Sequence, residues 1–127
     1  MDSSPADVVV RFNLCINSRD LDGLSALMAD EHVFIDAAET SIDGKEACLR
    51  AWRGFFEQFP DYRNIFDRIV ARDGEVAIGG RSTCSDARLD GPALWAATVW
   101  CGQVRQWRVC EDTPANRKRL GLNEPVR

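Results

Sequence analysis

The chain has 127 residues, the usual size of one domain, and is long enough to bury a core without disulfides or metals. Hydrophobic residues make up 45% and charged residues 28%, and no apolar run approaches the roughly 18 to 20 residues that a membrane span requires. The formal net charge of −4 provides no basic surface, so the composition argues against a nucleic-acid-binding protein.

The sequence also argues against a secreted protein and against one built around disulfides or a metal site. The start of the chain is polar and acidic, unlike a signal peptide, so we expect a cytoplasmic protein. The five cysteines are widely spaced without a C-x-x-C pair, which favours reduced thiols over a disulfide framework or a zinc site. Because His32 is the only histidine, a multi-histidine metal centre is excluded, and we expect neither metal nor cofactor.

Two helices are predicted before the first strand. Ser4-Pro5-Ala6-Asp7 is typical of a helix start, with a capping serine and a proline at the first helical position, and apolar residues then recur at helical spacing. Asp20 is expected to cap a second, shorter helix that ends at Asp30-Glu31. The next stretch, 31–39, predicts a short strand that is largely apolar on both faces and carries Asp36 near its end.

The second half of the chain predicts one more long helix and four strands. Asp43 and Glu46 resemble a capping box for this helix, and Pro60 ends it. Its wide apolar face comprises Cys48, Trp52, Phe55 and Phe59. Turn signals such as Asp73-Gly74 separate strand-like runs at 62–72, 75–85, 93–100 and 103–111, and a final helical turn opens at Thr113-Pro114.

This order of elements predicts an α+β fold. A curved, mostly antiparallel sheet would wrap around the three N-terminal helices and enclose a cone-shaped hollow, within a single domain over residues 1–127. The run 94–100 alternates poorly between apolar and polar residues, so the outer face of the sheet also needs a cover. We expect a homodimer through that outer face.

Several stretches of the chain resemble a known family. They are 9–12, 20–24, 26–30 and 32–36 in the first half, and 52–56, 59–62, 102–108 and 111–114 in the second. The first set is similar to the opening of the nuclear transport factor 2-like superfamily, which includes ketosteroid isomerase and the SnoaL-like polyketide cyclases. The second set is similar to the SnoaL-like branch more specifically. The resemblance implies a cystatin-like cone and a small hydrophobic molecule as partner.

Asp36 is the first candidate for a catalytic residue. The resemblance places it at the position of the general base of ketosteroid isomerase, and an apolar setting would disfavour its charged form, which suits a base. The positions of that enzyme's oxyanion hole correspond to Phe12 and to Ala96 or Ala97, which supply no polar group. A structural alternative remains open, in which the carboxylate accepts hydrogen bonds from backbone amides of residues 38–40.

Arg81 is the second candidate. If it faces the hollow, it would bind a carboxylate or enolate, or pair with Asp36 as in the limonene-epoxide hydrolase branch, which makes epoxide hydrolysis a further alternative. An outward-facing arginine is equally compatible with the pattern. His32 shares the strand face of Asp36, but four residues of strand separate them by about 13 Å. We therefore expect a surface or strand-end histidine and no His–Asp pair.

Aromatic residues are the predicted walls of the pocket. Trp95 and Trp100 have opposite strand parity, so both cannot line one cavity without a bulge. The residues expected to contact a ligand are Phe12, Phe34, Trp52, Phe56, Trp95 and Trp107.

Two functional hypotheses follow from the sequence. One is a cofactor-independent isomerase or cyclase, with Asp36 as general base and Arg81 as electrostatic partner, acting on a small hydrophobic carbonyl or polyketide-like substrate. The other is a non-catalytic ligand-binding or accessory domain with the same pocket. A carboxylate and a second polar group facing one enclosed space would favour the enzyme, whereas an Asp36 held by backbone amides would favour binding.

Overall fold

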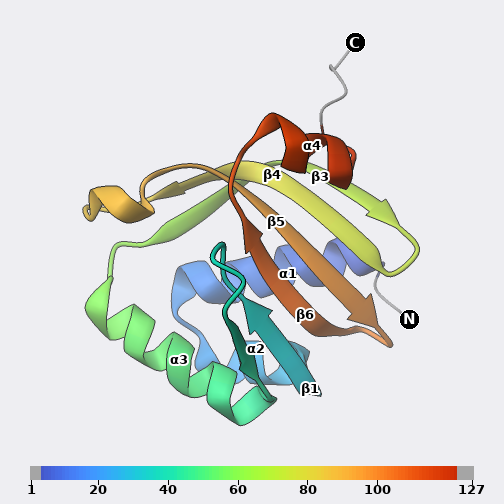
Figure 1. Ribbon diagram of the computed structural model, residues 1–127. Coiled ribbons are helices and arrows are strands. Elements are labelled where there is room, and N and C mark those ends of the chain that lie inside the picture. The colour runs from blue at the N-terminus through green and yellow to red at the C-terminus, as the bar shows by residue number, and fades with distance from the viewer. Residues whose placement is uncertain (1–3, 123–127) are drawn as a thin grey trace.

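The computed structural model describes residues 4–122, which form four α-helices and one six-stranded sheet (Figure 1). The sequence-predicted order of elements is confirmed. A short 3-10 turn, Ala87–Leu89, interrupts the connection between the fourth and fifth strands. The helices are α1 (Pro5–Ser18), α2 (Leu21–Leu27), α3 (Lys45–Gln58) and α4 (Pro114–Leu120), and the strands are β1 (Met28–Ile35), β2 (Ser41–Asp43), β3 (Arg63–Arg72), β4 (Glu75–Thr83), β5 (Gly91–Trp100) and β6 (Gln103–Cys110).

Side-chain caps begin α1 and α2 as predicted. The Ser4 hydroxyl accepts a hydrogen bond from the Asp7 amide at 3.1 Å, and the Asp20 carboxylate accepts one from the Gly23 amide at 2.9 Å. The predicted capping box at α3 is wrong: Gly44 occupies the cap position with a φ of 95° and α3 has no side-chain cap. A left-handed φ there favours glycine, and the backbone turn itself directs the chain into α3.

The sheet has the strand order β2-β1-β6-β5-β4-β3. Only β1 and β6 pair in parallel, and the other neighbours are antiparallel, which confirms a mostly antiparallel sheet. β3 contains an irregularity, because Phe66 pairs with Gly80 while Arg68 pairs with Gly79. Asp67 is thus an extra residue in β3, and a bulge of this kind bends the strand.

The helix side of the sheet carries the main core. Phe12 of α1 packs against Trp107 of β6 with ring centroids 4.7 Å apart, and Phe66 of β3 packs against Trp95 of β5 at 5.1 Å. Both tryptophans are 1% exposed and Phe12 is fully buried. Side chains therefore fill this deep part of the predicted hollow.

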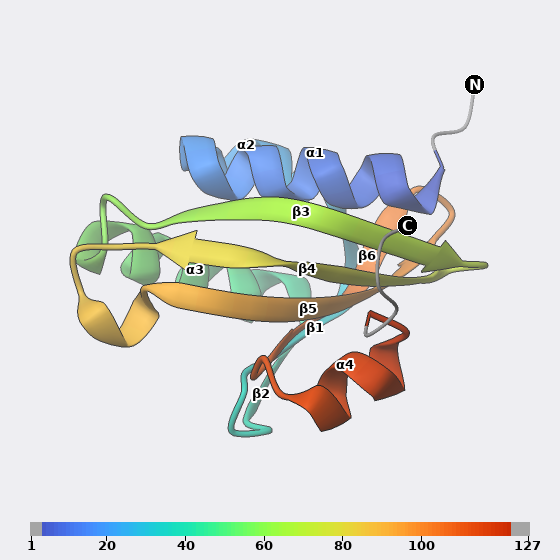
Figure 2. The same ribbon diagram turned by 90° about the horizontal axis from the view of Figure 1, so that it is seen from above.

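The outer face of the sheet has a cover within the chain. α4 lies on the side opposite α1 (Figure 2). There Leu120 and Leu122 pack with a second apolar cluster that includes Ala77, Leu94 and Cys110. Part of the apolar outer face that the sequence predicted is thus covered by α4, and the homodimer stays a prediction. Within residues 4–122, no helix is long and apolar enough to cross a membrane.

Candidate functional site

An apolar pocket lies between α3 and the β2-β1-β6 edge of the sheet. Its volume is about 190 Å³. Phe34, two residues before Asp36, and Trp52 both line it, and their rings meet edge to face with centroids 5.9 Å apart. The full lining is Phe34, Ile42, Cys48, Ala51, Trp52, Phe55 and Val109.

The polar group of this lining is the Cys48 thiol. It is buried and donates to the Ile42 carbonyl at 3.3 Å. Burial raises the pKa of Cys48, a hydrogen bond with the Phe34 backbone lowers it by less, and the charge of nearby Asp43 adds a still smaller increase. The thiol therefore remains protonated at neutral pH, and the pocket wall carries no charge.

Asp36 lies outside this lining, at the turn from β1 to β2. Its Oδ1 accepts hydrogen bonds from the amides of Ala38 and Thr40, both at 2.9 Å. Its own backbone closes the turn, because the Asp36 amide donates to the Thr40 carbonyl and the Glu39 amide donates to the Asp36 carbonyl. This is the structural capping arrangement that the sequence left open. The Asp36 carboxylate thus stabilises the turn.

Arg81 does not face the hollow. Residues alternate along β4, so that Ile78 lies in the helix-side core and Ala77 lies in the cluster beneath α4. Arg81 shares the parity of Ala77 and is exposed. In addition, β1 and β4 are three strand positions apart, about 14 Å at the usual spacing. Of the two alternatives that the sequence left open, the structure therefore has the outward-facing arginine, and it does not bring Arg81 and Asp36 together.

The other predicted aromatic contacts fall in the packed interior. Phe12, Trp95 and Trp107 belong to the buried core and do not line the pocket. Phe56 is 7% exposed, packs on Trp52 at 5.5 Å, and lies beneath the Arg19 guanidinium at 5.6 Å. Trp100 is 64% exposed and does not line this pocket. Pocket-lining residues that sequence reasoning missed include Ile42, Ala51 and Val109.

His32 is fully buried, so the expectation of a surface or strand-end histidine is wrong. Its Nδ1 donates to the Val104 carbonyl at 2.7 Å, and its ring lies 5.8 Å from that of Phe12. Its Nε2 has no hydrogen-bond partner among the described residues. Burial lowers the pKa of His32, and this effect exceeds the opposing effect of the hydrogen bond to Val104.

A small polar cluster lies between α1 and the start of β3, and sequence reasoning missed it. The Asn13 and Asn17 side-chain amides both donate to the Asn64 carbonyl, at 3.2 and 2.9 Å. The Ser82 hydroxyl donates to Asn64 Oδ1 at 2.8 Å, and the Tyr62 hydroxyl lies 3.3 Å from Ser82 Oγ. The signal in the sequence was weak, since it consists of single polar residues in a run predicted to be a helix (Asn13 and Asn17) and in two runs predicted to be strands (Tyr62, Asn64 and Ser82).

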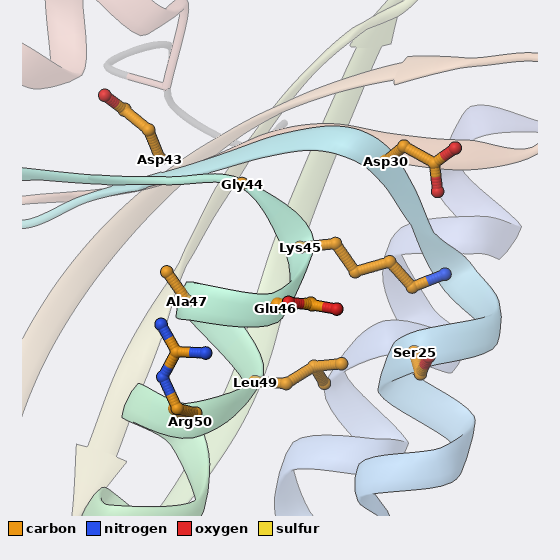
Figure 3. A pocket seen from close by; sticks show the side chains of 9 residues that line it. All are labelled: Ser25, Asp30, Asp43, Gly44, Lys45, Glu46, Ala47, Leu49 and Arg50. Carbon is orange, nitrogen blue, oxygen red and sulfur yellow. The ribbon is translucent and has the colours of Figure 1, made fainter.

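A wider polar groove lies between α2 and the start of α3, with a volume of about 770 Å³ (Figure 3). Asp30 of β1 and Lys45 of α3 extend into it, and Glu46 and Arg50 lie farther along α3. Three carboxylates and two cations line this groove, with Ser25, Asp43, Gly44, Ala47 and Leu49 completing its wall. The mixed charge and open shape select no class of ligand. No group of three metal-ligating side chains occurs in residues 4–122.

Comparisons with known proteins agree with this fold. A family model described as a SnoaL-like domain matches residues 9–111. A search of curated proteins finds no match. Similar solved structures include wild-type IdmH, a proposed polyketide cyclase from Streptomyces antibioticus, which is 20% identical over 94% of this chain and 99% of its own, with a TM-score of 0.73.

Two further structures show the range of proteins with this fold. An LEH-like epoxide hydrolase from M. tuberculosis is 19% identical, with 91% of this chain and 88% of its own covered and a TM-score of 0.75. An NTF2-like protein of unknown function from Cytophaga hutchinsonii is 12% identical, and the match covers 95% of this chain and 97% of its own, with a TM-score of 0.73. At these identities the likeness establishes the fold alone.

Proposed function

We propose, given that the chain belongs to the SnoaL-like domain family, that it binds a small, neutral, mainly apolar molecule in the pocket between α3 and β1. The family match also confirms the resemblance seen in the sequence. The observation that carries the proposal is the chemistry of the lining, which is aliphatic and aromatic with one protonated thiol and no charged side chain. A wall of this kind stabilises a bound apolar molecule and disfavours a charged one, because the charge would lose its hydration without finding a partner.

The volume of the pocket limits the size of the ligand. An apolar cavity of about 150 Å³ is large enough to bind benzene, whereas pockets for drug-sized molecules span about 300 to 1,000 Å³. A pocket of about 190 Å³ therefore suits a molecule with a single ring. A fused polycyclic ligand would require the walls to move.

Filling the pocket mouth is expected to abolish binding without disturbing the core. Ala51 lines the pocket but is itself exposed, so an indole at this position occupies the mouth at little cost to packing. In Ala51→Trp, the affinity for a one-ring probe such as toluene should fall at least tenfold, measured by NMR titration. Ala115→Trp, an equivalent change on the exposed side of α4, is the control and should leave binding unchanged. Equal affinity in both variants would contradict the proposed site.

Cofactor-independent isomerase or cyclase chemistry with Asp36 as the base is the second candidate. Two observations favour it: Asp36 follows pocket-lining Phe34 by two residues, and a structural neighbour is a proposed polyketide cyclase. For any carbonyl substrate that the protein turns over, Asp36→Asn should lower kcat at least a hundredfold, because an amide cannot accept the proton. Asparagine retains an oxygen that can accept the hydrogen bonds of the turn amides, so the turn is expected to persist in this variant. Unchanged turnover would therefore exclude Asp36 as the base.

A further inference from the structure

A second hollow lies on the outer face of the sheet, between β3, β4, β5 and the end of α4. Its volume is about 220 Å³. Figure 2 shows α4 on this face, on the opposite side of the sheet from α1. The hollow shares no lining residue with the apolar pocket beside α3, so the two are separate sites.

Small side chains form the floor of the hollow. Ala77 of β4 pairs with Val70 of β3 on one side and with Ala96 of β5 on the other, so these three residues form one row across the sheet. All three line the hollow, together with Leu120 of α4, which packs near Ala77. The short side chains leave room for a ligand, and their methyl groups would contact its apolar part.

Two arginines and one carboxylate line the same hollow. They are Arg72 of β3, Arg119 of α4 and Glu75 of β4. Neither arginine forms an ion pair with any residue in the range 4–122. The Glu75 carboxylate accepts a hydrogen bond from the Thr98 hydroxyl at 3.2 Å. The hollow therefore has an excess of one positive charge, and an anion between the two guanidinium groups would relieve their mutual repulsion.

Neutral groups hold both arginines in place. Arg119 Nη2 donates to Asn116 Oδ1 at 2.7 Å, and the Asn116 side-chain nitrogen donates to the Glu111 carbonyl at 2.9 Å, which orients that amide. The Arg72 guanidinium lies against the end of α4, since a Cβ on Gly121 would be 3.1 Å from Arg72 Nη2. A guanidinium group has five N–H donors, so both arginines retain donors for a ligand.

We infer that this hollow binds a small carboxylate with a short apolar tail. The planar guanidinium fork matches the two oxygens of a carboxylate, and an excess of one positive charge favours a monoanion over a dianion. The tail would lie on the row of small side chains, and a volume below that of sites for drug-sized molecules limits it to about one ring. The uncharged wall of the pocket beside α3 disfavours the same anion.

Benzoate and benzyl alcohol are matched probes, because they share a ring and differ in the charge of its substituent. In NMR titrations of the intact protein at low salt, benzoate should shift the backbone amide signals of Ala77, Ala96 and Leu120 until they saturate. Benzyl alcohol should bind at this place at least about fivefold more weakly, since it cannot form an ion pair with an arginine.

Four charge variants locate the site. Arg72→Gln and Arg119→Gln should each weaken benzoate binding about fivefold, the upper end for an exposed ion pair. Glu75→Gln should strengthen binding, because it removes a repelling charge and keeps an oxygen that can accept from Thr98. Lys118→Gln is the matched control: Lys118 precedes Arg119 but does not line the hollow, so the affinity should be unchanged. All four side chains are exposed, so the variants are expected to fold.

Three results would overturn the inference. One is equal weakening in Lys118→Gln and Arg119→Gln, which would reflect only the net charge of the protein. Another is benzyl alcohol binding as tightly as benzoate, or no saturable shift with benzoate. The third is benzoate shifting the amide signals of Cys48 and Ala51 instead, which would place the anion in the apolar pocket and contradict the proposed neutral ligand as well.

Discussion

Replacing Gly80 with alanine is expected to lower the free energy of unfolding by about 3 kcal/mol or more, the upper end of what overpacking costs. A Cβ at Gly80 would lie 2.0 Å from the carbonyl oxygen of Ile65 and 3.0 Å from the Phe66 Cα. Both are backbone atoms of β3, so no side-chain rotation relieves the clash. The strand would have to move, and with it the Phe66 ring that packs against Trp95.

The neighbouring glycine provides a matched control with the opposite sign. A Cβ at Gly79 would meet the Leu94 and Leu122 side chains at 3.7 and 3.9 Å, which are ordinary contacts. Gly79→Ala should therefore stabilise the protein by about 0.4 to 1 kcal/mol, because alanine restricts the unfolded chain. Urea unfolding of both variants measures the difference. Equal midpoints for the two would contradict the close approach of β3 to β4.

Acidification is expected to destabilise the protein through its single histidine. The pKa of His32 is lowered in the folded state, so below pH 6.5 the unfolded chain binds a proton that the folded chain does not. The stability that neutral His32 contributes is complete above pH 6.5 and is lost as the pH falls toward the folded pKa. The slope reaches at most about 1.4 kcal/mol per pH unit.

The physical cause is the burial of His32, which disfavours the charged imidazolium, and no described residue offers an acceptor for a second imidazole proton. His32 Nδ1 already donates to the Val104 carbonyl, and no described residue accepts from Nε2. Unfolding measured between pH 7.5 and 5.5 should show the slope in the wild-type protein and not in His32→Phe. This window lies above the range in which ordinary carboxylates titrate. Imidazole NMR signals that titrate at or above pH 6.5 would contradict the prediction.

Local signals in the sequence were sufficient to predict the elements. The caps at Ser4 and Asp20, the turn at Asp73-Gly74 and the helical spacing of Trp52 and Phe55 all act within a few residues. The cone then follows from the order of elements and from the family resemblance. In the same way, a carboxylate followed by small residues was enough to propose that Asp36 closes its own turn.

The site could not be predicted because it depends on contacts between distant strands. Strand parity places His32 on the same face as Phe34, but its burial involves packing against Phe12 of α1, a contact between distant segments. Phe66, beside the bulge in β3, packs against Trp95 and Trp107. These rings fill the depth of the cone, and the pocket lies at its α3 side. The orientation of Arg81 could not be predicted for the same reason, because no local pattern indicates which face of β4 packs against the helices.

The parallel pairing of β1 with β6 has a consequence for the order of folding. Met28 pairs with Val104, whereas β3 to β6 form a meander of antiparallel neighbours connected by turns. The β1–β2 edge joins the sheet only through β6, so its docking must close a loop that contains most of the chain. During synthesis the β1–β2 edge, which carries Phe34, is made early but cannot join the sheet until β6 has been made. The ligand pocket is therefore expected to be among the last parts of the protein to form.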